Sequence, residues 1–179
     1  MKAGRNKTID LSVEEGKSYL DRCISISKPT DLQSVINKTI LGDTFSILPL
    51  LPTKFVDLLI ADPPYNLDKN FNGKKFKKTS DEMYEEYTES WIKSVLPLLK
   101  EDATIYVCCD WQSSPTIGKV LKKYFYIQNR ITWQREKGRG ALSNWKNGME
   151  DIWFATVSKH YTFNVDKVKV RRKVIAPYK

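Results

Sequence analysis

The segment FVDLLIADPPYNL, from Phe55 to Leu67, constrains the fold more than any other part of the chain. Its first six residues are apolar apart from Asp57, and such a run is typical of a strand buried on both faces, as in a parallel sheet. Pro63 and Pro64 end this strand, because proline has no N–H to donate to a sheet ladder. A carboxylate and an aromatic ring therefore follow the strand on a stiff loop.

Strand and helix patterns alternate after this loop. Residues 80–100 predict a long helix with Ser80 as its N-cap and acids in its first turn, and residues 113–125 predict a second helix with Pro115 in its first turn. Strands are expected at 103–110, 126–135 and 149–159. This alternation predicts an α/β sheet, whose ligands bind beyond the carboxyl ends of the strands.

Weaker patterns surround this core. Ser12 and Glu15 form a capping box that predicts a helix over residues 10–26, and a short helix is expected after Pro29. The remaining segments are assigned as follows: a brief strand at 38–43, a short helix or turn at 44–52, a polar lysine-rich loop at 67–79, and a basic alternating tail at 165–179.

Charge and cysteine content limit the function. The 179-residue chain has a formal net charge of +9 and a pI of about 9.4, which favours a polyanionic partner, most often nucleic acid. Three cysteines without a C-x-x-C pair and a single histidine, His160, predict no zinc cluster and no metal. Free thiols suit a reducing, cytoplasmic compartment. No apolar stretch approaches the roughly 20 residues that span a membrane.

The pair of motifs LGD (41–43) and VDLLIADPPYNL (56–67) closely resembles the amino-methyltransferases of DNA. The signature of that family is [Asp/Asn/Ser]-Pro-Pro-[Tyr/Phe/Trp], and the resemblance runs from about Lys38 to Phe163. It implies a Rossmann-like methyltransferase sheet and transfer of a methyl group from S-adenosyl-L-methionine to an exocyclic base amine in double-stranded DNA. Aspartate in the first position goes mostly with adenine, and a cytosine-amine-specific enzyme is the alternative.

The chemistry of the signature is consistent with this activity. The amine lone pair of adenine is delocalised into the ring, so it is a poor nucleophile. The Asp62 carboxylate and the Pro63 carbonyl can accept its two N–H hydrogens and favour a pyramidal nitrogen. Tyr65 offers a stacking face for an extruded base. We therefore assign Asp62, Pro63, Pro64 and Tyr65 as catalytic, although Asp-Pro-Pro is also ordinary turn chemistry.

The resemblance implies further site residues. Contacts to the cofactor are expected from Asp43, Ala61, Asp62, Asn66, Leu67 and Asp110, and Asp110 could equally cap a strand end. Trp133, Asn144 and Glu150 are expected near the flipped base, with a core role as the alternative for Trp133. DNA contacts are expected from Lys69, Lys74, Lys75, Lys77, Lys78, Arg139, Asn144, Arg171 and Arg172. The alternatives are a solvated lysine loop and, for the tail, an exposed edge strand blunted by lysine.

The Phe-x-Gly-x-Gly turn of the family is absent from this sequence. In a permuted class the signature precedes that turn, so we expect an incomplete sheet that contains only the strands of the signature half. The expected organisation is an N-terminal helical extension (1–36), the catalytic half (37–164) and the start of a target-recognition region (165–179). A second chain or a homodimer would supply the glycine-rich turn, unless the chain is part of a longer one. A catalytically silent DNA-binding module and an RNA or protein-glutamine methyltransferase are the other interpretations.

Overall fold

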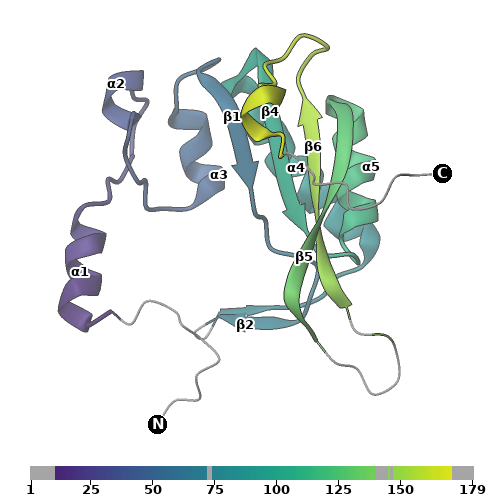
Figure 1. The fold of residues 1–179 in the computed structure, drawn as a ribbon. Helices are drawn as coiled ribbons and strands as arrows, with labels where there is room; N and C mark the ends of the chain where they lie inside the picture. Colours follow the sequence, from purple (N-terminus) through teal and green to yellow (C-terminus); the bar gives the residue numbers. More distant parts are fainter. Residues whose placement is uncertain (1–10, 72–73, 140–144, 146, 171–179) are drawn as a thin grey trace.

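The computed structural model describes residues 11–71, 74–139, 145 and 147–170. Its centre is a four-stranded sheet in the order β1-β4-β6-β5 (Figure 1). Strand β1 (Val56–Ala61) runs parallel to β4 (Leu99–Cys109), and β6 (Asn147–Thr156) runs antiparallel to both β4 and β5 (Tyr126–Arg139). The expected strands after the signature are confirmed, and the chain returns through β6 between β4 and β5.

Two helices cover one face of the sheet (Figure 1), and the core lies between them and β4. Helix α4 (Asp81–Val95) begins after Ser80, whose Oγ accepts the N–H of Met83, and it continues into the 3-10 turn η2 (Leu96–Leu98). Helix α5 (Ser114–Tyr124) has Pro115 in its first turn. Both helices were expected from local signals and are confirmed, although the first was expected to run to residue 100 and β4 already begins at Leu99. The fully buried apolar side chains include Ile92, Ile105, Val107, Ile117, Val120 and Leu121.

Strand β1 is the edge of the described sheet, and its burial differs from the expectation. Leu59 and Ala61 are partly buried on the helix side, whereas Leu58 and Ile60 on the other face are 51% and 67% exposed. The prediction of burial on both faces is therefore wrong for the described residues. The physical reason is that α4 and α5 cover one face only, so the alternation of a strand leaves every second side chain uncovered.

The segment after β6 covers part of that second face. Phe154 of β6 stacks on Tyr106 of β4 with ring centroids 5.0 Å apart, and Tyr161 and Phe163 pack against Phe154 from the returning segment. The short helix α6 (Val165–Val168) follows and lies in front of the sheet in Figure 1. The edge-strand alternative for the tail is wrong over these residues, and 171–179 lie outside the described residues.

Three weak predictions are changed by tertiary contacts. Helix α1 (Val13–Asp21) has the expected capping box, but it ends before Ile24, which forms an isolated parallel bridge with Ile40. The strand expected at 38–43 is reduced to this single bridge. The lysine-rich loop contains an antiparallel hairpin, β2 (Lys69–Phe71) and β3 (Lys74–Phe76). The other short elements are α2 (Leu32–Val35), α3 (Thr44–Ile47) and the 3-10 turn η1 (Leu48–Leu50).

Within the described part of the chain, no helix combines the length and the apolar character that crossing a membrane requires.

Candidate active site

Two parallel strands bring two loops to one end of the sheet. Ala61 pairs with Val107, so β1 and β4 end side by side, toward the lower end of the molecule in Figure 1. The loop 62–67 follows β1, and the turn that begins at Asp110 leads from β4 into α5. The β2–β3 hairpin lies at the same end (Figure 1). The sequence thus places its signature loop at the edge where open α/β sheets bind ligands.

Buried and partly buried hydrogen bonds hold the signature loop from three sides. The Oγ of Ser113, which is 2% exposed, accepts the N–H of Asn66 at 3.1 Å. The Asn66 side chain donates to the carbonyl of Thr79 at 3.0 Å and accepts the Thr79 N–H at 2.8 Å. The hydroxyl of Tyr84 on α4 donates to the carbonyl of Pro64 at 3.0 Å. The loop is therefore anchored to Tyr84 on α4, to Ser113 just before α5, and to Thr79 just before α4.

Asp110 supports this anchor instead of pointing at the cleft. Its Oδ1 accepts the backbone N–H of Ser113 at 2.9 Å, and its carbonyl accepts the N–H of Ser114 at 2.9 Å. The Ser113 hydroxyl makes no capping hydrogen bond to α5, because it serves the signature loop. The structure therefore shows Asp110 as a cap at the end of β4. A contact between Asp110 and a cofactor remains a prediction.

The tyrosines of the site are held in the protonated form. Burial raises the pKa of Tyr65 well above its ordinary value, and a hydrogen bond with Asp62 and the charge of that carboxylate raise it further. The protonated hydroxyl of Tyr65 is thus the donor in its interaction with Asp62. Burial likewise raises the pKa of Tyr84 to about 12, partly offset by a hydrogen bond with Ser113. Both phenols act as donors at neutral pH.

The signature loop borders a cleft of about 430 Å³. The opposite side of the cleft is built by residues far away in the sequence: Phe76 from β3, Arg135 from β5 and Glu150 from β6. Arg135 and Glu150 form an ion pair through Nη2 and Oε1. One guanidinium and two carboxylates, those of Asp62 and Glu150, therefore line the same cleft. The pattern of the sequence did not single out Arg135 or Phe76 as cleft residues.

A second, more apolar cavity of about 260 Å³ lies on the other side of the same loop. It shares Pro64, Tyr65 and Phe76 with the first cleft. Its remaining wall is made by residues of α4 and of the segment before it: Asn66, Lys77, Thr79, Met83, Tyr84 and Tyr87. Tyr65 thus lines both cavities.

The expected catalytic and cofactor residues fall into two groups. The four residues of the signature and one residue after it line the cleft: Asp62, Pro63, Pro64, Tyr65 and Leu67. Asn66 is buried and committed to its hydrogen bonds, and Ala61 is the last residue of β1. Asp43 lies at the start of α3, where its carboxylate accepts the N–H of Ser46 at 2.9 Å. Contacts of these residues to a cofactor remain predictions.

Two of the three residues expected near the flipped base are described. Glu150 lines the cleft, and Trp133 lies directly opposite it on β5. Trp133 is 59% exposed, so the core role considered for it is wrong. Asn144 lies outside the described residues.

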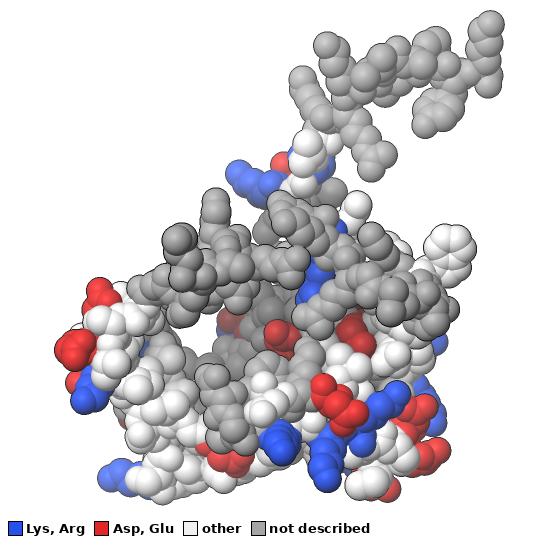
Figure 2. Space-filling model, turned by 90° about the horizontal axis from the view of Figure 1, so that it is seen from below, with Lys and Arg blue, Asp and Glu red and all other residues white. Residues whose placement is uncertain are grey.

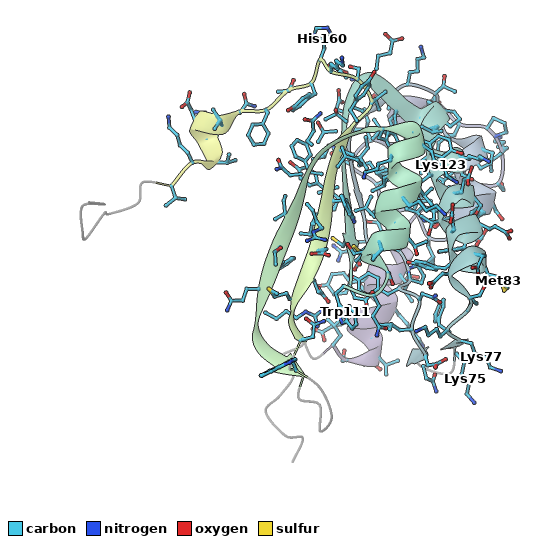
Figure 3. The ribbon with its side chains drawn as sticks, turned by 90° about the vertical axis from the view of Figure 1, so that its right-hand side faces the viewer. Lys75, Lys77, Met83, Trp111, Lys123 and His160 are labelled. Atoms are coloured by element: carbon cyan, nitrogen blue, oxygen red, sulfur yellow. The ribbon has the colours of Figure 1, made fainter. Side chains whose placement is uncertain are left out.

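The expected DNA-contacting lysines lie beside the site end. Figure 3 shows Lys75 and Lys77 at the same end as Trp111, with His160, the only histidine of the chain, at the opposite end. The side chains of Lys75, Lys77 and Lys78 are exposed. Seen from the site end in Figure 2, basic and acidic side chains are interspersed over the described surface. Lys69, Lys74 and Arg139 are placed only as residues of β2, β3 and β5, and Arg171 and Arg172 lie outside the described residues.

The sheet order and the anchored Asp-Pro-Pro-Tyr loop at its ligand edge define a Rossmann-like methyltransferase domain. The solved PvuII DNA methyltransferase, which is cytosine-N4-specific, aligns with 80% of this chain and 54% of its own at a TM-score of 0.58 and 16% identity. TTHA0409 from Thermus thermophilus, complexed with S-adenosyl-L-methionine, aligns with 71% of this chain and 56% of its own at a TM-score of 0.53 and 16% identity. At these identities the likeness establishes the fold alone.

The chain belongs to the DNA methylase family described as "N6_N4_Mtase: DNA methylase", whose model matches residues 56–174. It is 30% identical to DNA adenine methyltransferase YhdJ of Escherichia coli (strain K12) over 148 residues, which are 82% of this chain and 50% of that protein. It is 34% identical to the type II methyltransferase M1.MboII of Moraxella bovis over 137 residues, 75% of this chain and 52% of that protein. The chain thus spans about half the length of the curated relatives it matches.

Proposed function

We propose that this chain is the amine-polarising half of a DNA methyltransferase that moves a methyl group from S-adenosyl-L-methionine to the exocyclic amine of a flipped adenine. The observation that carries the proposal is the Asp62 carboxylate, which lines a cleft together with Tyr65 at the carboxyl end of a parallel strand. Membership of the DNA methylase family supports the same reaction.

The chain contributes hydrogen-bond acceptors and rigidity to this reaction. Asp62 and the carbonyl of Pro63 accept the two N–H groups of the amine, which directs its lone pair away from the ring. The hydrogen bonds of Pro64 and Asn66 fix the loop in advance, so the acceptors need not reorganise. The new N–C bond forms from the amine lone pair, and the surplus proton of the amine leaves through Asp62 to water.

The donor of the methyl group fits the chemistry of the cleft. S-adenosyl-L-methionine supplies a methyl group on a sulfonium, whose C–S bond breaks with the electron pair staying on sulfur. The carboxylate of Asp62 complements such a cation, since the Glu150 carboxylate is already paired with Arg135, and Leu67 and Phe76 offer apolar contacts for its carbon chain. We assign Asp62 and Leu67 as the residues of this chain that would hold it.

We infer adenine as the substrate base, with the cytosine amine as the alternative. Aspartate in the first position of the signature favours adenine, and two relatives point to the two bases. YhdJ is named a DNA adenine methyltransferase, whereas the PvuII enzyme is cytosine-N4-specific. The exposed lysines of the hairpin segment would contact the phosphates beside the flipped base.

The edge of β1 is where we expect the remainder of the cofactor pocket to join. No described strand pairs with the outer side of β1, and Leu58 and Ile60 are exposed on the face of the sheet that α4 and α5 leave uncovered. An unpaired strand edge favours pairing with another strand. A partner chain, a second copy of this chain or a further segment bearing a glycine-rich turn would fill this place. Native mass spectrometry of the purified protein distinguishes these three by the number and masses of the chains.

The test of the proposal is methyl transfer to unmethylated DNA of mixed sequence, read as N6-methyladenine or N4-methylcytosine by nucleoside mass spectrometry. The chain is assayed alone and co-expressed with a fragment that carries a glycine-rich turn. Asp62→Ala should lower transfer roughly 100- to 1,000-fold, the range for losing one preorganised group. The matched control is Asp57→Ala, because Asp57 lies on the strand that leads to Asp62 but pairs with Lys100 at 2.7 Å.

The outcomes separate the competing functions. Transfer that survives Asp62→Ala contradicts the mechanism. DNA binding that is unaffected by Asp62→Ala, without methylation in any combination, supports the catalytically silent module instead. Full transfer by this chain alone would refute the need for a completing portion.

A further inference from the structure

The Arg135–Glu150 ion pair lies inside the cleft that holds Asp62, although its residues come from the β5–β6 ribbon. Trp133 is directly opposite Glu150, and Arg135 is two residues further along β5. Residues two apart in a strand point to the same face, so Trp133, Arg135 and Glu150 share one face of the ribbon. The face of the ribbon that bears the ion pair therefore borders the cleft opposite the signature loop.

A simple stabilising role explains the pair poorly. The side chain of Arg135 is 48% exposed, and exposed ion pairs contribute little to stability. The same ribbon has a comparable pair on its other face, Arg130 and Asp151, with Nε and Oδ1 3.9 Å apart. That second pair does not line the cleft, so it provides an internal comparison for the first.

Guanidinium chemistry indicates what the cleft pair can do. Arg135 has five N–H donors and no acceptor, and the bond to Glu150 uses only part of them. Adenine presents a ring acceptor, N1, beside its amine, and cytosine presents N3 in the equivalent place. Guanine and thymine carry an N–H at that position. Asp62 and the Pro63 carbonyl are acceptors for an exocyclic amine, and Arg135 in the same cleft is a donor for the ring nitrogen beside it. This set matches the amine and ring nitrogen of adenine and cytosine, whereas guanine and thymine carry a carbonyl oxygen in place of that amine.

We propose that Arg135 is a base-selecting residue that donates a hydrogen bond to the ring nitrogen next to the target amine; this inference rests on the proposed function. Glu150 positions the Arg135 side chain. Glu150 also compensates the guanidinium charge. This compensation matters because positive charge develops on the amine as it is methylated, and a bare cation beside it would oppose the reaction.

The experiment measures DNA binding by the 179-residue chain in the absence of S-adenosyl-L-methionine. The probes are fluorescent thymidine octamers with one central residue replaced by deoxyadenosine, deoxycytidine, deoxyguanosine or 1-deaza-deoxyadenosine, which lacks N1. Fluorescence anisotropy gives each Kd at low salt. We expect deoxyadenosine and deoxycytidine to bind roughly tenfold more tightly than the other two, the order of one hydrogen bond from a charged donor.

The variants assign this preference to the residue. Arg135→Ala should reduce the difference between deoxyadenosine and its 1-deaza analogue to within about twofold, since the donor is gone. Arg135→Lys should keep part of it, because lysine retains a cationic donor without the planar fork. The matched control Arg130→Ala removes the ion pair on the other face and should leave the preference unchanged.

Each result is informative. Equal binding of all four octamers by the unaltered chain contradicts the inference and leaves the proposed function standing. A preference that persists in Arg135→Ala also contradicts it. Failure to bind any octamer contradicts base selection by this chain, whereas the proposed function is decided separately by the methyl-transfer assay.

Discussion

Removing one hydroxyl group from α4 should measurably loosen the signature loop. Tyr84 is buried, and its hydroxyl donates to the Pro64 carbonyl at 3.0 Å and interacts with Ser113. Tyr84→Phe deletes both interactions without creating a large cavity. The net value of one hydrogen bond is about 0.5–1.5 kcal/mol, and an unsatisfied buried partner costs about 1–3 kcal/mol. We therefore expect a loss of about 1–2 kcal/mol in the free energy of unfolding.

The matched control is Tyr87→Phe. Tyr87 is the neighbouring ring on α4, with its centroid 6.0 Å from that of Tyr84, and it lines the same apolar cavity. Among the described residues its hydroxyl makes no hydrogen bond that would be lost. Its removal should change the free energy of unfolding by no more than about 0.5 kcal/mol.

Urea unfolding followed by tryptophan fluorescence measures both variants under the same conditions. For a domain of this size, 1 kcal/mol corresponds to a shift of about 2–4 °C in Tm, so thermal unfolding provides a second readout. Amide hydrogen exchange of residues 62–67 should rise in Tyr84→Phe and stay unchanged in Tyr87→Phe. Equal stability and equal exchange in the two variants would refute the conclusion that this hydroxyl anchors the loop.

Three further predictions test other parts of the structure. Gly118→Ala should destabilise the chain, because the added Cβ would lie 2.4 Å from Cζ2 of Trp153 and overpacking of about 1–3 kcal/mol outweighs the helix propensity gained. Gly16→Ala has no atom within 4 Å of the added Cβ, so the free energy of unfolding should rise by about 0.5–1 kcal/mol. Urea unfolding measures both variants. Hydrogen bonds from Tyr124, Lys123 and Lys93 lower the pKa of Glu89 from 4.5 to about 2, so the folded state loses this stabilisation as pH falls through that window. Glu89→Gln should therefore flatten the dependence of the urea midpoint on pH across the same window. An unchanged slope would contradict this. Ile60→Asp should leave the stability of the isolated chain within about 0.5 kcal/mol. It should weaken association with any partner that covers the exposed sheet face of β1, measured by native mass spectrometry against the unaltered chain.

Local signals in the sequence predicted the helices well because their causes are local. Ser80 and Ser12 accept hydrogen bonds from residues three positions later, and Pro115 needs no partner at the first turn of α5. The strand before Asp62 was equally clear, since proline ends it. The signature therefore indicated both the position of the loop and its rigidity.

The cleft could not be predicted in the same way, because it depends on pairing between distant strands. Arg135 shares a cleft with Asp62 only because β6 folds back between β4 and β5, and the register of β5 shifts after Gln134. Phe76 reaches the cleft only through the β2–β3 hairpin, which the polar composition of its segment concealed. The exposure of Leu58 and Ile60 likewise depends on which elements cover the sheet.

The outer edge of β1 and the active site lie next to each other in the structure. Asp62 follows the last residue of an edge strand whose outer side has no partner among the described residues. A strand that adds in parallel to β1 would have its own carboxyl end beside Asp62, because parallel neighbours end at the same edge of a sheet. An antiparallel strand would bring its amino end there instead. Parallel addition would therefore pair the outer backbone edge of β1 and bring a second loop to the cleft in a single event. We expect stability of the β1 edge and methyl transfer to rise together when the completing portion binds.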